Sequence, residues 1–155
     1  MAMPSKQDED TQIGFRPARE TDLEFLYQLH VLTMKEYVDQ TWGWDESFQQ
    51  SVFRKNFNPA ELQVVTFNNS DIGMIAVEYQ DEVTFLRAIE IHPHYQRQEL
   101  GTHILRSLLD KAAHSRKPVV LRVLKVNPAQ RLYQRLGFKV VEETATHYIM
   151  RTAKG

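Results

Sequence analysis

Cysteine is absent from the 155-residue chain, which excludes disulfide bonds, a thiolate nucleophile and thiolate metal sites. No apolar run reaches the roughly 18 residues that a membrane-spanning helix needs, so no membrane partner is expected. The first ten residues lack the apolar segment of a secretory signal, and residues 1–11 are expected to be a disordered polar tail or a cloning remnant. These absences together favour the cytoplasm.

Charge of neither sign dominates, because the net charge is −1, but the two signs are separated along the chain. Residues 1–86 contain six Lys and Arg against fifteen Asp and Glu, whereas residues 87–135 contain ten against three. The basic segment indicates a polyanionic ligand, although folding can also mix these charges in space. The length suits one domain, which is expected over residues 12–151.

Hydrophobic periodicity predicts an alternation of strands and helices along this domain. Strands are expected over residues 12–16, 62–67, 72–79, 83–92, 118–124, 138–142 and 146–151. Helices are expected over residues 21–38, 46–56 and 99–115, with a further short helix that Asn127 and Pro128 open and Gly137 ends. This order predicts an α/β (α+β) fold, in which helices cover the faces of one mixed sheet.

The segment Pro93–Thr102 leads from a strand into a helix and has the features of a phosphate-binding loop. The first N–H groups of a helix have no partner within it and lie at the positive end of its dipole, where phosphates bind. Gly101 permits close approach of the backbone, and Arg97 adds positive charge. An ordinary strand–turn–helix can have the same composition.

A second segment, Val126–Phe138, has a good structural explanation, since Asn127 can cap a helix and Pro128 suits its first position. Taken together, however, the two segments resemble the signatures of the GNAT superfamily of acyl-CoA N-acyltransferases. The first reads Gln96-x-x-Glu99-x-Gly101, similar to the family's Gln/Arg-x-x-Gly-x-Gly/Ala. The second matches the family's order at Asn127, Leu132, Tyr133, Gly137 and Phe138.

The resemblance implies the GNAT fold, a twisted mixed sheet that splays near its centre and holds the cofactor in the splay. It implies acetyl-CoA as acyl donor, a primary amine as acceptor and direct transfer in a ternary complex; relatives often form homodimers. The loop backbone would hold the CoA pyrophosphate at Gln96, Arg97, Gln98, Glu99, Leu100, Gly101 and Thr102. Glu99 departs from the family's glycine: its carboxylate can repel phosphate, and its side chain is strained if φ is positive.

The resemblance also implies roles for individual residues. Tyr133 would protonate the leaving thiolate, a plausible transfer because a phenol has a pKa of about 10 and a thiol about 8.5. Asn127 would orient the cofactor or the tyrosine, and Leu132 would belong to the cofactor site. The strand with Ile89 and Ile91 would align the thioester through its backbone, and the Ile91 amide would be the oxyanion donor.

The attacking amine must lose a proton, and Glu90 is the first candidate for the general base because it lies on the same strand. Its side chain can instead point away from the site, since neighbouring residues alternate along a strand. His92 is the second candidate, acting directly or through water. Bulk water is the third.

Both tryptophans, Trp42 and Trp44, lie in the predicted loop between the first two helices, a region that lines the acceptor pocket in this superfamily. Together with neighbouring aromatic and acidic side chains they suit a cationic amine that has an apolar part. These neighbours are Glu36, Tyr37, Asp45 and Glu46. Alternatively, the two indoles pin the loop to the core.

No metal is expected, because His92 and His94 form too short a pair and no third ligand is evident. No nucleic acid is expected either. Two rival functions stay open. One is an acyl-CoA-binding regulator without turnover, which Glu99 supports; the other is acetylation of a protein N-terminus or lysine. An open groove beside Trp42 would favour peptides, and a closed acidic pocket would favour a small amine.

Overall fold

The structure, a computed structural model, describes residues 12–153 without the side chains of Arg97 and Gln98, so the expected tail lies outside the described residues. The strands are β1 (Ile13–Pro17), β2 (Gln63–Phe67), β3 (Ser70–Tyr79), β4 (Thr84–Ile91), β5 (Val119–Leu124), β6 (Lys139–Glu143) and β7 (His147–Arg151). The α-helices are α2 (Leu23–Trp42), α3 (Glu46–Asn56), α4 (Leu100–His114) and α5 (Gln130–Arg135). Short 3-10 helices lie at Glu20–Asp22, Pro59–Glu61 and Pro93–Gln98.

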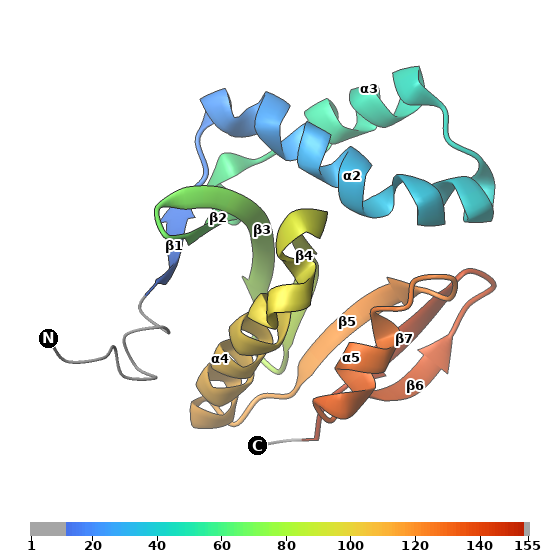
Figure 1. Cartoon of the computed structure of the whole chain (residues 1–155). Helices are drawn as coiled ribbons and strands as arrows, with labels where there is room; N and C mark the ends of the chain where they lie inside the picture. Colours follow the sequence, from blue (N-terminus) through green and yellow to red (C-terminus); the bar gives the residue numbers. More distant parts are fainter. Residues whose placement is uncertain (1–11, 154–155) are drawn as a thin grey trace, which may run out of the picture.

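The seven strands form one mixed sheet in the order β1-β2-β3-β4-β5-β7-β6. Neighbouring strands are antiparallel, except for β4 and β5, which are parallel. The β4–β5 pairing joins only Thr84–Leu86 to Val119–Leu121, and beyond it the two strands separate (Figure 1). The prediction of an α/β fold with a mixed sheet that splays near its centre is therefore confirmed.

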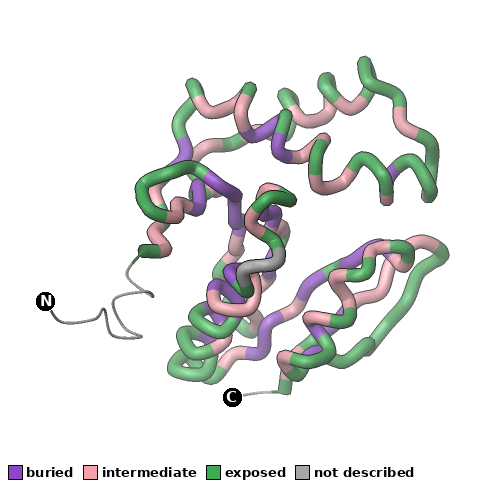
Figure 2. The backbone as a smooth tube through the Cα atoms, in the orientation of Figure 1, coloured by how far each residue is buried: buried purple, intermediate pink, exposed green. Residues whose placement is uncertain are grey.

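Two apolar clusters hold the helices to opposite faces of the sheet. The larger cluster packs α4 and α5 on one face, and its most buried members include Val65, Leu105, Val119, Phe138 and Met150. The smaller cluster packs α2 and α3 on the other face through Leu26, Leu29, Val64 and Met74. Figure 2 shows the buried segments along the inner strands, whereas α3 and β6 are largely exposed.

Two helix boundaries differ from the prediction. Helix α2 continues to Trp42 because the break comes only at Gly43, whose φ of 84° is in the left-handed range that glycine tolerates. Trp42 is therefore the last helical residue and not part of the loop. Helix α5 begins only at Gln130, because the Asn127 side chain accepts the N–H of Ala129 at 2.9 Å and forms a turn before the helix.

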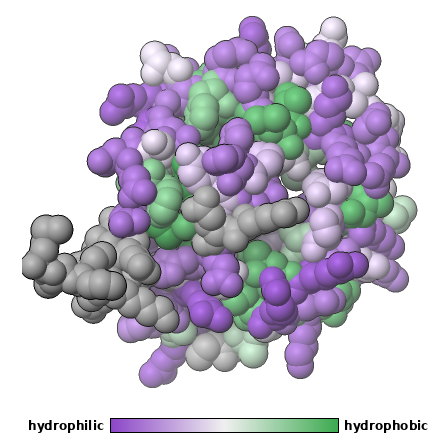
Figure 3. All heavy atoms as spheres, viewed as in Figure 1, coloured by the Kyte–Doolittle hydropathy of each residue, from purple (hydrophilic) through white to green (hydrophobic). Residues whose placement is uncertain are grey.

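The surface on the side of α4 and α5 is mostly hydrophilic, but hydrophobic side chains reach it in the middle of the view in Figure 3. This area lies between the layer of α2 and α3 and the elements below it (Figure 1). Within residues 12–153, no helix combines the length and the hydropathy needed to cross a bilayer.

Candidate active site

An extra residue in β4 decides which side chains point into the splay. Strand β3 pairs with Leu86 and with Ala88 at consecutive positions, so Arg87 between them forms a β-bulge. The bulge resets the alternation of side chains along the strand. Leu86 and Ile91 consequently pack in the same cluster as α4, while Glu90 points toward α2.

The main chain of β4 beyond the bulge faces the open side of the splay. The N–H of His92 donates to the carbonyl of Ile72 in β3 at 2.7 Å, and alternate residues of a strand direct their main-chain groups to opposite edges. The N–H groups of Ile89 and Ile91 therefore point toward β5, which is no longer paired with β4 at this position. This edge can bind a ligand as an additional strand would bind.

A cavity of about 330 Å³ lies along this edge, between β4 and helices α4 and α5. Below, it is called the inner cavity. An outer cavity of about 360 Å³ continues from it past the first turn of α4, and the two share Gln96, Gly101 and Leu132. Arg106 and Arg135 line the outer cavity, so its far end has side chains that can bind an anion.

The start of α4 lies between these two cavities. Glu99 precedes the helix with φ 59° and ψ 16°, a left-handed conformation in which a side chain is strained. The sequence alone left open whether φ of Glu99 is positive, and the structure shows that it is. A Cβ added to Gly101 would lie 3.8 Å from its nearest neighbour, Leu132 Cδ2, so packing does not require glycine there. Because Gly101 has no Cβ, the backbone of the first turn of α4 stays open to the cavity.

Glu90 is buried, with 7% of its surface exposed, and two α2 side chains hold one of its oxygens. The Thr33 hydroxyl donates to Oε1 at 2.6 Å, and His30 Nδ1 lies 2.9 Å from the same atom. Burial lowers the pKa of His30, but the hydrogen bond and the charge of Glu90 outweigh it, so the net shift is upward. Oε2 makes no hydrogen bond with the described residues, and Glu90 lines the inner cavity.

Tyr133 of α5 lines the same cavity and packs against Phe138, with ring centroids 5.7 Å apart. Burial, and then the negative charge of Glu90, raises the pKa of Tyr133 to about 12. The phenol is therefore protonated at neutral pH and can act only as a proton donor there.

A cavity of about 300 Å³ lies on the far side of Glu90 and Tyr133. Below, it is called the distal cavity. It shares Met34, Ile89, Glu90, Asn127 and Tyr133 with the inner cavity, so the two meet at these side chains. Two ligands can therefore approach this junction from opposite sides of the splay.

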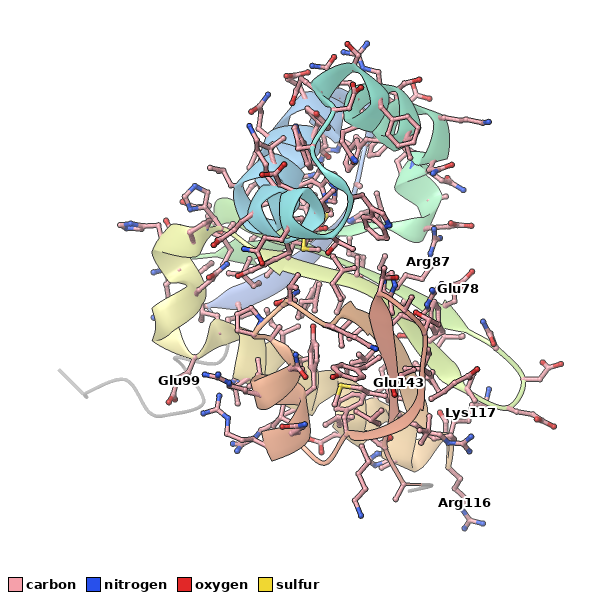
Figure 4. All side chains as sticks on the ribbon, turned by 90° about the vertical axis from the view of Figure 1, so that its right-hand side faces the viewer. Glu78, Arg87, Glu99, Arg116, Lys117 and Glu143 are labelled. Atoms are coloured by element: carbon pink, nitrogen blue, oxygen red, sulfur yellow. The ribbon has the colours of Figure 1, made fainter. Side chains whose placement is uncertain are left out.

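One wall of the distal cavity joins the helical layer to the C-terminal strands. Trp42 at the end of α2 lies against His147 at the start of β7, with ring centroids 5.9 Å apart. Arg87 and Arg122 also line this cavity. Figure 4 shows Arg87 between the helical layer and the strands below it, with Glu99 at the opposite side of the view.

The sequence model of the acetyltransferase (GNAT) family matches residues 23–138, three quarters of the chain. The chain belongs to this family. No curated protein matches it.

Solved structures with the same fold include several GNAT acetyltransferases. The PaiA N-acetyltransferase from Thermoplasma acidophilum, in complex with coenzyme A, is 18% identical, with a TM-score of 0.71 over 90% of this chain and 98% of that chain. The ribosomal-protein-S18-alanine N-acetyltransferase from Escherichia coli is 21% identical, with a TM-score of 0.67 over 92% and 94%. Arabidopsis thaliana Naa50, in complex with the bisubstrate analogue CoA-Ac-MVNAL, is 14% identical, with a TM-score of 0.62 over 92% and 99%.

The residues expected to bind the donor in this GNAT protein fall into two groups. Those that line the inner or outer cavity are Ile89, Ile91, Gln96, Glu99, Gly101, Thr102, Asn127 and Leu132. Leu100 is buried in the core, so only its backbone is available. The side-chain amide of Gln96 donates to the Ile91 carbonyl at 2.9 Å, which ties the loop to β4. The side chains of Arg97 and Gln98 lie outside the described part.

The residues expected to bind the acceptor are more dispersed. Trp42 lines the distal cavity, whereas Tyr37 lines the inner cavity. Glu36 is exposed and lines neither of them. Trp44 is held outside both cavities by Glu46, whose Oε2 accepts its indole N–H at 2.7 Å.

Asp45 of the α2–α3 loop and Glu46 at the start of α3 make hydrogen bonds that hold the local structure. Asp45 caps α3 by accepting the N–H of Phe48, and Glu46 also accepts a hydrogen bond from Tyr27 at 2.9 Å. The acidic acceptor pocket considered from the sequence therefore has no counterpart in the distal cavity, where Glu90 is the one acidic residue among the described lining.

His92, the second candidate base, caps the 3-10 helix that follows β4: its Nδ1 accepts the N–H of His94 at 3.1 Å. Within residues 12–153, no three His, Asp or Glu side chains gather closely enough to hold a metal ion.

Sequence reasoning missed His30 and Thr33, which hold Glu90, and Arg106, Arg122 and Arg135. The basic character of residues 87–135 was the available signal for the three arginines. No local signal indicates the contact from α2, because His30 and Glu90 are 60 residues apart in sequence.

Proposed function

We propose that this protein transfers an acetyl group from acetyl-CoA to a primary amine by direct transfer in a ternary complex. One observation carries the proposal: the inner and distal cavities meet at Glu90 and Tyr133, a candidate base and a candidate acid. Donor and acceptor can enter from opposite sides and react where they meet. Proximity of this kind replaces a bimolecular encounter by a reaction within one complex.

The outer cavity suits the phosphates of an acyl-CoA, and the inner cavity suits its extended arm and thioester. Arg106 and Arg135, with the amides at the start of α4, would bind its phosphates, and the open backbone near Gly101 allows their close approach. The N–H groups of Ile89 and Ile91 would bind the extended arm and the thioester carbonyl. The bound thioester supplies an activated acyl group.

Tyr133 would donate a proton to the leaving sulfur. Because its pKa is raised to about 12, donation must accompany cleavage of the carbon–sulfur bond instead of preceding it. A phenol with this pKa is in its acid form across the physiological range.

Glu90 would accept the proton of the attacking amine through Oε2, while Thr33 and His30 fix the carboxylate through Oε1. His92 is less suited as a direct base, because its Nδ1 is occupied by the N–H of His94. The base is thus a carboxylate whose orientation α2 determines.

The test is thiol release from acetyl-CoA with a panel of amines, together with calorimetry of CoA binding. Tyr133→Phe is expected to lower kcat by about 10²- to 10⁴-fold, as loss of a general acid does, with little change in the Kd for CoA. Tyr79→Phe is the matched control, because Tyr79 is exposed near the far end of β3 and should change neither quantity. An equal fall in turnover and binding for Tyr133→Phe would refute the acid role.

Two observations favour other functions. The strained Glu99 beside the phosphate-binding backbone favours a protein that binds acyl-CoA weakly and regulates without turnover. The likeness to a ribosomal-protein acetyltransferase and to Naa50 favours a peptide acceptor. Thiol release with a small amine excludes the first, and release only with peptides supports the second.

A further inference from the structure

The distal cavity has a charge pattern that amine acetylation alone does not explain. Its charged and titratable lining consists of His30, Arg87, Glu90, Arg122, Tyr133 and His147. The one carboxylate in this described lining is the candidate base, and α2 already holds one of its oxygens. Away from Glu90, the cavity therefore presents positive charge.

Arg122 is the cation of this lining that has no acidic partner among the described residues. Arg87, in contrast, forms an ion pair with Glu61 at 2.8 Å. Arg122 is exposed on β5, on the same sheet face as Leu124 and, on the neighbouring strand, His147. Both residues line the distal cavity, and burial and then the charge of Arg122 lower the pKa of His147.

We propose that the amine acceptor also carries an anionic group, a carboxylate or a phosphate, and that Arg122 binds this group while the amine lies at Glu90. The inference rests on the proposed function, since it names the class of acceptor for the same site. An acceptor with a second ammonium group would instead meet two arginines and no further carboxylate.

The size of the cavity points to a small acceptor. Its volume of about 300 Å³ is at the lower end for ligand pockets. The contact between Trp42 and His147 joins α2 to β7 along one wall of the cavity. An amino acid or an amine of similar size that bears an acid fits this space.

The experiment compares acceptors that differ only in the group at the far end. γ-Aminobutyrate, butylamine and putrescine have similar chains that end in a carboxylate, a methyl group and an ammonium group. Leucine and isoamylamine separately test a carboxylate next to the amine, and aminopropylphosphonate tests a phosphate-like anion. Thiol release from acetyl-CoA gives kcat/KM for each.

The anionic acceptors are expected to exceed their neutral counterparts about ten- to a hundredfold in kcat/KM, the range for a hydrogen bond to a charged group. Arg122→Gln is expected to raise KM for the anionic acceptors until their kcat/KM equals that of butylamine with the same variant, while Arg122→Lys keeps part of the preference. Arg151→Gln is the matched control, since Arg151 is exposed on β7 and lines none of these cavities.

Equal kcat/KM for γ-aminobutyrate and butylamine would overturn the inference, as would a preference for putrescine or a preference that survives Arg122→Gln. Turnover with peptides alone would also overturn it. These failures differ from failure of the proposed function, which would appear as no thiol release with any acceptor.

Discussion

Replacing Glu99 separates two effects of this residue at the start of α4, the strain of its left-handed backbone and the charge of its carboxylate. With φ 59°, this residue is in the left-handed region, where a side chain costs roughly 1–2 kcal/mol relative to glycine. Its carboxylate is favourable near the helix N-terminus, by about 0.5 kcal/mol. Glu99→Gly should therefore raise the free energy of unfolding by about 0.5–1.5 kcal/mol, whereas Glu99→Gln should lower it slightly.

The effect on CoA binding comes from charge alone. A unit charge about 8 Å from a doubly charged diphosphate, in water-like surroundings, costs about 1 kcal/mol, or roughly fivefold in Kd. Both Glu99→Gln and Glu99→Gly should therefore tighten CoA binding by about this factor at low salt, and the gain should shrink at high salt.

Arg116 provides the matched control, because it has φ 57° just after the other end of α4 (Figure 4). Arg116→Gly should stabilise the protein by the same backbone mechanism and leave CoA binding unchanged. The assays are thermal unfolding and calorimetric titration with CoA at two salt concentrations. An unchanged Kd for Glu99→Gln at low salt would refute the placement of the diphosphate beside this residue.

Gly73→Ala should destabilise the protein by about 1–3 kcal/mol and lower kcat, because the added Cβ would lie 2.5 Å from the backbone oxygen of Glu90. Gly14→Ala is the control: its added Cβ would meet only the Thr66 side chain, so kcat should stay unchanged. The pKa of His30 is raised from its ordinary 6.5, so its pairing with Glu90 stabilises the fold fully below about pH 6.5 and less as pH rises through the folded-state pKa. Denaturant titrations between about pH 6 and 8 should show this decline in the wild type and a smaller one in His30→Gln, and equal slopes would contradict the pairing.

The order of strands and helices could be predicted from the sequence because each element has its own periodic pattern. Helix α4 is an example, since its apolar residues recur at helical spacing and its buried residues follow this spacing, at Leu100, Ile104, Leu105, Leu108 and Ala112. The two boundaries that differed were decided by single residues, Gly43 with its positive φ and Asn127 with its turn. The exact end of a helix depends on such single residues, and hydrophobic periodicity does not locate it.

The candidate site was only partly accessible from the sequence. The segments around Gly101 and Tyr133 could be assigned because their motifs are continuous in the chain. The bulge at Arg87, which turns Glu90 toward α2, depends on the pairing register with β3 and has no local signature. The positive charge of the distal cavity arises from β4, β5 and β7 together, so it emerges only when the sheet forms.

The most direct test of the central claim is a calorimetric titration of the protein with CoA and with acetyl-CoA. Binding with a stoichiometry of one is expected, and it should weaken in Arg106→Gln and Arg135→Gln, which line the outer cavity. No heat with either ligand at millimolar concentration would contradict the claim that the amides at the start of α4 and the open edge of β4 form an acyl-CoA site.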